Sequence, residues 1–151
     1  LFADRSAVLP FIAIAAGICD GLGFGTNSRT GIITRGLGEI ARLGKAMGAN
    51  PITFLGLSGM GDLILTCTGD LSRNRKVGYH LGQGQSLSQA LANLGMVAEG
   101  VNTARAAVDL AKKFKVEMII CEHVYDILYT GKSPRTVAHD IMMRDLKPEF
   151  A

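Results

Sequence analysis

The stretch SRTGIITRGLGEIARLGKAM, residues 28–47, places apolar side chains at steps of three and four along the chain. Its apolar positions are Ile32, Ile33, Leu37, Ile40, Leu43 and Met47. Such steps keep side chains on one face of an α-helix, because the helix turns once every 3.6 residues or so. The stretch therefore predicts a long helix with one face against a core.

The rest of the chain shows the same helical pattern between short joints rich in glycine. Further helices are expected over residues 11–20, 72–81, 86–94, 98–113, 121–130 and 133–146, with a short one from Asn50-Pro51. Residues 116–120 are the one candidate for a strand, and a lone strand cannot form a sheet. We therefore expect an all-α fold, a single helical domain of about seven or eight helices.

Length, charge and hydropathy exclude several classes of protein. A chain of 151 residues with 48% hydrophobic and 19% charged residues suits one domain with a buried core. The net charge of +3 is modest, and the basic residues are dispersed apart from 73–76 and 112–115, which favours a local anionic ligand over nucleic acid. The apolar run over 8–19 is too short for an integral membrane segment.

Cysteine and histidine usage gives no sign of a metal site. Cys19, Cys67 and Cys121 lie far apart and lack the spacing of metal ligands, so buried, reduced thiols are expected. That state favours a cytoplasmic protein. The histidines fall on separate predicted helices, which makes them poor candidates for shared ligation. They are His80, His123 and His139.

Gly21, Gly23 and Gly25 follow an apolar run and suggest a dinucleotide-binding turn. The spacing does not fit the G-x-G-x-x-G fingerprint, because Thr26 or Ser28 stands where the third glycine would be needed. We expect these glycines to let the chain turn or two helices approach closely.

Two neighbouring segments combine an acid, hydroxyls, an amide and cations near one short loop. They are Gly59–Cys67 and Ser72–Lys76. Asp62 and Thr66 are four residues apart and would share a helix face, while Ser72 can cap the next helix and leave its first N–H groups for an anion. Arg73 would add a planar charged group there. These residues alone also allow a plain surface loop followed by a basic helix start.

Five motifs occur in an order and at a spacing that are specific when taken together. They are Gly21–Asn27, Ile33–Leu37, Gly61–Leu63 with Thr66-Cys67, Ser72–Arg75, and Ala98–Gly100 with Asn102-Thr103. On these motifs, the chain from about Ala13 to about Leu146 resembles the C-terminal, substrate-binding domain of the NAD(P)-dependent glycerol-3-phosphate dehydrogenases of bacterial type. The resemblance implies an all-α domain like that of 6-phosphogluconate dehydrogenase-like enzymes. It also implies an upstream Rossmann domain, absent from this chain, that would hold the cofactor.

The resemblance further implies an oxidoreductase site for dihydroxyacetone phosphate or sn-glycerol 3-phosphate. The positions that match substrate contacts are Asp62, Thr66, Ser72, Arg73 and Asn74, and those that match cofactor contacts are Arg73, Val97 and Glu99. The implied reaction is hydride transfer between NAD or NADP and C2 of the three-carbon substrate, for glycerophospholipid synthesis. A homodimer is one possible assembly.

The start of the chain departs from the family pattern. The family carries an acid–base lysine followed by asparagine just before the apolar run, and these positions fall on Leu9 and Pro10 here. Leucine cannot transfer a proton, and proline would disturb a helix. We therefore set residues 1–10 apart as an atypical segment before a helical domain over 11–151. No catalytic residue is named, and we expect no turnover by this chain alone.

Two alternatives stay open at this point. The first is a freestanding, non-catalytic helical module for binding or dimerisation, derived from the same family and favoured by Leu9 and the absent cofactor domain. The second is a related two-domain dehydrogenase acting on a 3-hydroxyacyl or sugar-acid phosphate substrate. The polar set between Asp62 and Asn74 argues against the second alternative.

Arg35 lies among apolar positions of the helix predicted over 28–47. A buried arginine needs a partner, so we expect Arg35 to pair with Glu39, four residues on, or with Asp20. Such a structural pair is favoured over a catalytic role for Arg35.

Overall fold

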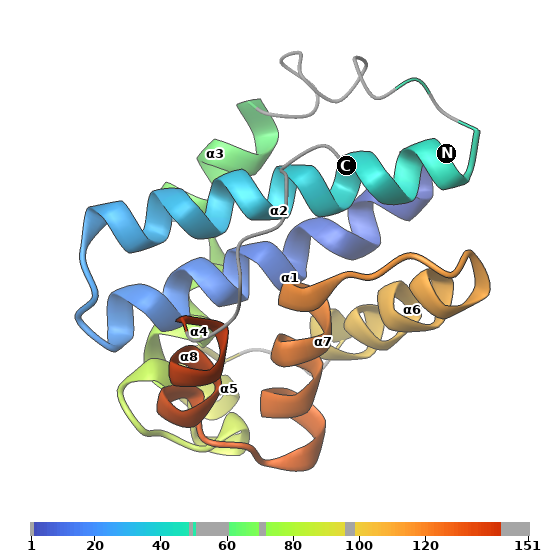
Figure 1. Cartoon of the computed structure of the whole chain (residues 1–151). Coiled ribbons are helices and arrows are strands. Elements are labelled where there is room, and N and C mark those ends of the chain that lie inside the picture. The colour runs from blue at the N-terminus through green and yellow to red at the C-terminus, as the bar shows by residue number, and fades with distance from the viewer. Residues whose placement is uncertain (1, 49, 51–60, 70–71, 96–98, 143–151) are drawn as a thin grey trace.

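The computed structural model describes residues 2–142 except for 49, 51–60, 70–71 and 96–98 (Figure 1). Residues 2–9, 62, 66, 99–104 and 141–142 are described by their backbone alone. The helices are α1 (Phe2–Gly21), α2 (Thr26–Ala46), α3 (Asp62–Thr68), α4 (Arg73–Gly82), α5 (Leu87–Asn93), α6 (Glu99–Lys113), α7 (Ile119–Tyr125), the π-helical turn η3 (Asp126–Thr130) and α8 (Pro134–Met142). No residue in these ranges lies in a strand, and the predicted all-α fold is confirmed. The helix expected from Asn50-Pro51 lies largely outside the described residues.

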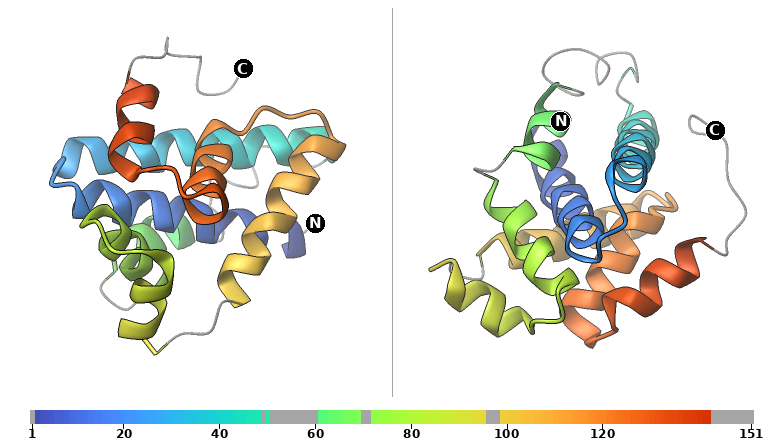
Figure 2. Two further views of the ribbon diagram at one scale, coloured as in Figure 1. Left: turned by 90° about the horizontal axis from the view of Figure 1, so that it is seen from below. Right: turned by 90° about the vertical axis from the view of Figure 1, so that its left-hand side faces the viewer.

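Helix α1 lies at the centre of the domain and contacts α2, α3, α4, α6 and α7. Figure 2 shows α2 on one side of α1 and α4 on the other. Residues 11–19 are all buried, because apolar or small residues occupy every side of this part of the helix. The helix predicted over 11–20 begins earlier, at Phe2, and runs through Pro10, so proline does not end it.

Glycines bring the backbones of α1 and α4 into direct contact. A Cβ atom added to Gly17 would lie 2.0 Å from the carbonyl oxygen of Arg75, and one added to Gly78 would lie 2.0 Å from that of Ile14. Gly21 and Gly82 continue this seam, each meeting backbone of the other helix. Any larger side chain at the closest positions would force the helices apart.

The turn between α1 and α2 contains the other two glycines of the Gly21-x-Gly23-x-Gly25 run. Gly23 has a φ of 78° and Gly25 a φ of 86°, a region that side-chain-bearing residues rarely adopt. The glycines thus serve close helix approach and turning, as predicted, and no strand precedes them.

Glu39 of α2 is a buried charged residue, with 2% of its surface exposed. Its carboxylate accepts the backbone N–H of Ile120 at 2.6 Å and that of Cys121 at 3.4 Å, at the start of α7. Burial raises the pKa of Glu39 to about 7, although the two backbone hydrogen bonds oppose the rise.

The prediction that Arg35 is buried is wrong, since its side chain is exposed. The buried stripe of α2 runs through Gly36, where an added Cβ atom would lie 2.6 Å from the side chain of Ile12, and Arg35 stands beside that stripe. Neither expected partner holds it: Glu39 bonds the start of α7, and Asp20 pairs with Arg29 and Arg75.

The candidate strand over 116–120 is not formed. Residues 116–118 link α6 to α7, and α7 begins at Ile119. Met118 and Ile120 are nonetheless buried, so their apolar character reflects core packing. The helix predicted over 121–130 is α7 continued by η3. Among the described helices, none is both long and apolar enough to cross a membrane.

Candidate functional site

The start of α4 brings the first backbone N–H groups of a helix next to a cation. Ser72 is the N-cap residue, and its side-chain oxygen accepts the N–H of Arg75 at 3.2 Å. The first N–H groups of a helix have no acceptor within the helix, and here they belong to Arg73 and Asn74. Arg73 is exposed and Asn74 is half-buried. This arrangement can bind an anion, because the N–H groups and the guanidinium lie at the positive end of the helix dipole.

Asp20, at the end of α1, forms ion pairs with two arginines near this helix start. Its Oδ2 atom lies 2.9 Å from a guanidinium nitrogen of Arg75 and 3.3 Å from one of Arg29. The exposed fractions of the three side chains are 14% for Asp20, 16% for Arg75 and 24% for Arg29. Such partial burial weakens solvent screening and strengthens the charge–charge attraction.

Helix α3 carries the other predicted substrate positions. Leu63 and Cys67 are fully buried and anchor the helix, which contacts α1, α2 and α4. Asp62 and Thr66 lie one turn apart on the same helix, as predicted from their spacing, and their side chains lie outside the described part. The helix that carries both positions contacts α4.

The remaining predicted positions are less fully described. Val97 lies outside the described residues, and Glu99 begins α6 without a described side chain. Leu9, which the resemblance matches to the family lysine, lies on α1 with only its backbone described. Of the residues assigned to a cofactor, Arg73 alone has a described side chain.

The three cysteines are buried and unbridged, as the sequence predicts. Burial raises the pKa of Cys19 to about 11 and that of Cys67 to about 12, the latter despite the nearby guanidinium groups of Arg29 and Arg75. The pKa of Cys121 is also raised well above its ordinary value, chiefly by burial. Nucleophilic thiolate chemistry is therefore not available to them near neutral pH. Within the described ranges, no three His, Cys, Asp or Glu side chains could share a metal ion.

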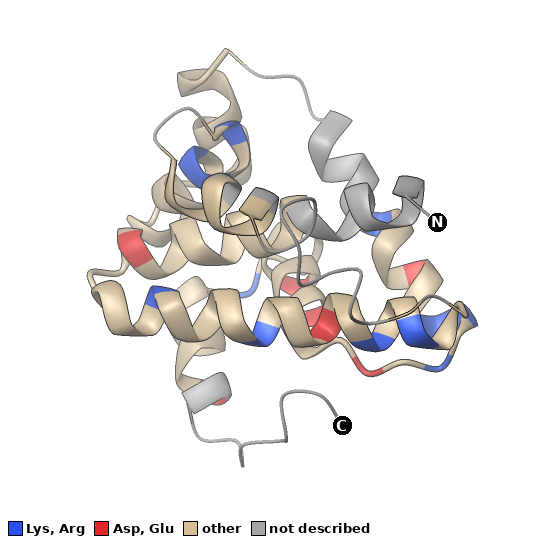
Figure 3. Cartoon of the chain, turned by 90° about the horizontal axis from the view of Figure 1, so that it is seen from above, with Lys and Arg blue, Asp and Glu red and all other residues tan. Residues whose placement is uncertain are grey.

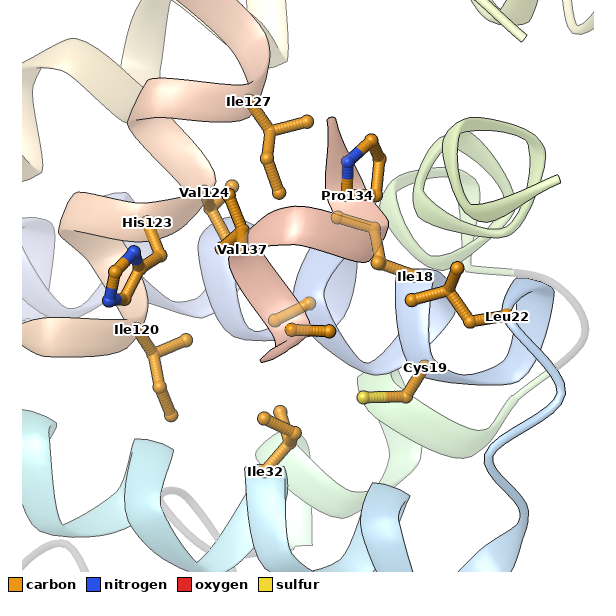
Figure 4. Close-up of a pocket in the computed structure, with 12 residues that line it drawn as sticks. Ile18, Cys19, Leu22, Ile32, Ile120, His123, Val124, Ile127, Pro134 and Val137 are labelled. Carbon is orange, nitrogen blue, oxygen red and sulfur yellow. The ribbon is translucent and has the colours of Figure 1, made fainter. Parts of the chain in front are cut away.

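Two hollows lie elsewhere in the domain. One of about 40 Å³ is lined by apolar side chains of α1, α2, α7 and α8, with His123 among them (Figure 4). The other, of about 210 Å³, has Ser28 and Arg35 among its lining residues. Neither is lined by a residue of α3 or α4. The first does not suit a phosphorylated polyol, whose polar groups need hydrogen-bond partners.

In the view of Figure 3, the described Lys and Arg residues are distributed over several helices, with Asp and Glu residues among them.

Comparison with known proteins identifies the family of this chain. The family model described as "NAD-dependent glycerol-3-phosphate dehydrogenase C-terminus" matches residues 6–139. The chain belongs to this family. The match begins at Ser6, within the segment 1–10 that the sequence analysis sets apart.

Curated relatives and solved structures carry the same assignment. The glycerol-3-phosphate dehydrogenase [NAD(P)+] of Syntrophobacter fumaroxidans is 60% identical over 139 residues, covering 92% of this chain and 41% of that protein. The enzyme of the same name from Citrifermentans bemidjiense is 60% identical over 143 residues, 95% of this chain and 43% of its own length. A crystal structure of the Coxiella burnetii glycerol-3-phosphate dehydrogenase superposes with a TM-score of 0.88 at 38% identity, covering 93% of this chain and 43% of that one. The chain thus spans about two fifths of the length of the curated relatives it matches.

The sequence did not predict the pair between Asp20 and Arg75. Arg75 belonged to the Ser72–Arg75 motif and to a basic helix start, and Asp20 was a candidate partner for Arg35. The signal that could have found them is the pairing of one acid with cations on separate helices, which needs the tertiary arrangement.

Proposed function

We propose that this chain is the substrate-binding domain of a glycerol-3-phosphate dehydrogenase, which interconverts dihydroxyacetone phosphate and sn-glycerol 3-phosphate with NAD or NADP. The observation that carries the proposal is the start of α4, where the side chain of Ser72 caps the N–H of Arg75 and exposed Arg73 lies in the first turn. Family membership supports the same reaction.

The two ends of the substrate require different groups. A phosphate dianion fits the start of α4, where the Arg73 guanidinium and the first helical N–H groups can donate to its oxygens. The amide of Asn74 can reach the same phosphate or the adjoining hydroxyl group. Asp62 and Thr66 lie on α3. We propose that Asp62 accepts a hydrogen bond from the carbon skeleton of the substrate and that Thr66 offers it a hydroxyl group. These roles rest on the match of both residues to family positions.

The nicotinamide cofactor would supply or accept the hydride at C2. Arg73 could contact either the cofactor or the substrate, because its exposed guanidinium group can bind a phosphate of either ligand. Val97 and Glu99 are proposed to complete the cofactor contacts from the start of α6. A Rossmann domain outside this chain would hold the rest of the dinucleotide.

This chain is proposed to bind substrate without completing the proton transfer. By the resemblance, Leu9 matches the family's acid–base lysine position, and leucine has no ionisable group to protonate a developing alkoxide. We further propose a cytoplasmic location, a role in glycerophospholipid synthesis and assembly as a homodimer. The named relatives are dehydrogenases, so a freestanding module is the less favoured reading.

Titration of the isotope-labelled chain with sn-glycerol 3-phosphate tests the binding role. Backbone amide signals of Arg73, Asn74 and Arg75 are expected to shift in a saturable way, and glycerol, which lacks the phosphate, should leave them in place. Shifts confined to α7 and α8, or none at all, would overturn the assignment of this site.

A further inference from the structure

Asp20 lies near the candidate anion site, at a point where four helices meet. It lies in the last turn of α1, its two arginine partners come from the first turns of α2 and α4, and all three side chains are partly buried. Helix α3 contributes buried Cys67 to the same region, and the charges of Arg29 and Arg75 act on its thiol.

We propose that Asp20 is a positioning residue for phosphate recognition, acting through Arg75 to hold the start of α4 in its binding geometry. The inference rests on the proposed function, since it gives a support to that same site. Asp20 itself contacts arginines and is not proposed to touch substrate.

The two arginines at the start of α4 have different roles. Arg73 and Arg75 are two residues apart on α4, so their side chains leave the helix on nearly opposite sides. Arg73 is exposed and available to a ligand, whereas Arg75 turns inward to Asp20 at 2.9 Å. The backbone N–H of Arg75 is also the group that Ser72 caps. One residue therefore links the cap, the helix start and the acid on α1.

The pair with Asp20 acts next to a close contact between two helices. The α1–α4 contact is a seam of glycine against backbone, with Gly17 facing the carbonyl of Arg75. Such a close contact sets the distance between the two helices. The short, partly buried ion pair beside it adds a directional restraint on the start of α4.

Substitution of Asp20 separates positioning from simple charge. Asp20→Asn removes a negative charge near the anion site, so a purely electrostatic role predicts tighter binding of a phosphate ligand. A positioning role predicts weaker binding, by about tenfold, because Arg75 loses its charged acceptor and the helix start its restraint. The two readings thus differ in sign.

The experiment measures the dissociation constant of sn-glycerol 3-phosphate by amide-shift titration in the wild-type chain and its variants. Asp20→Asn is expected to bind about tenfold more weakly, and Asp20→Glu, which keeps the charge but moves it by one methylene, to lose part of the affinity. Equal or tighter binding by Asp20→Asn overturns the inference. If Asp20→Asn does not fold, Asp20→Glu decides, and an unchanged affinity in that variant overturns the inference.

Two controls separate positioning from general destabilisation. Asp126→Asn removes an acid from the more exposed pair with Lys132, at 3.3 Å, and should leave the affinity unchanged. Val124→Ala opens a cavity in the buried part of α7 and should lower the thermal midpoint without weakening the ligand. If Val124→Ala weakens binding as much as Asp20→Asn does, the inference fails. If the wild-type chain binds no sn-glycerol 3-phosphate, both the proposed function and the inference fail. If the wild-type chain binds it and the Asp20 variants bind it with the same affinity, the positioning role alone is overturned.

Discussion

The carboxylate of Glu39 accepts the backbone N–H of Ile120 at 2.6 Å, although 81 residues separate the two in the chain. Helix α7 begins without a side-chain cap from its own N-cap residue, Met118. An acid from α2 therefore performs this task from across the core. The arrangement ties α2 to α7 and buries an ionisable group between them.

The first prediction concerns the pH dependence of stability. Burial raises the pKa of Glu39 from 4.5 to about 7, so the folded chain holds a proton that the unfolded chain releases. The free energy of unfolding should fall as pH rises from about 4.5 to about 7, by on the order of 3 kcal/mol, and change little from this group above that range. Glu39→Gln keeps an acceptor oxygen for Ile120 but has no proton to lose, so its stability should not show this fall. Urea unfolding at several pH values measures both curves, and parallel curves for the two proteins would contradict the prediction.

The second prediction concerns the glycine seam between α1 and α4. A Cβ atom on Gly17 would lie 2.0 Å from the backbone carbonyl oxygen of Arg75, so Gly17→Ala must push α4 away from α1. We expect the variant to lose about 2–3 kcal/mol of unfolding free energy. Gly31→Ala is the matched control on α2, where an added Cβ atom meets nothing within 4 Å and should stabilise the helix by about 0.5–1 kcal/mol. Thermal unfolding of both variants checks the expected opposite signs.

The third prediction assigns the phosphate contact to one of several neighbouring cations. Arg73→Ala should weaken binding of sn-glycerol 3-phosphate by tenfold or more, roughly the loss of one charge-assisted hydrogen bond, and Arg73→Lys should recover only part of the affinity. Lys76, exposed one turn further along α4, is the control for net charge. Titration calorimetry compares Arg73→Ala with Lys76→Ala, and equal losses would show that bulk charge and not Arg73 binds the phosphate.

The fourth prediction concerns catalysis. Fused to the cofactor-binding region of a bacterial relative, the chain should still show no oxidation of NADH by dihydroxyacetone phosphate, because Leu9 cannot donate a proton. The double substitution Leu9→Lys with Pro10→Asn introduces the residues that the resemblance assigns to these positions and should produce measurable turnover. Absorbance at the nicotinamide band follows the reaction. Activity in the unsubstituted fusion would show that another group supplies the proton.

Local features of this protein follow from neighbouring residues and were therefore predictable from the sequence. The spacing of apolar residues over 28–47 predicted the helix observed at Thr26–Ala46, and Ser72 predicted the cap of α4. Both were predictable because helix periodicity and capping depend on residues only a few positions apart. The order of the motifs was likewise sufficient to indicate the family.

Contacts between distant residues were decided only by the tertiary structure. Arg35 was misjudged because its helix turns Gly36, rather than Arg35, toward Ile12. Residues 116–118 have β-prone neighbours yet form a link, since core packing uses the same apolar residues that a strand would.

Two pairs that join separate helices lie far apart in the chain. Asp20 meets Arg75 across 55 residues, and Glu39 meets Ile120 across 81. No periodicity or local propensity encodes such pairs, because each depends on the distance and rotation at which whole helices pack. Here the glycines of α1 and α4 set the distance, and the few buried charges act at the points where that packing brings them together.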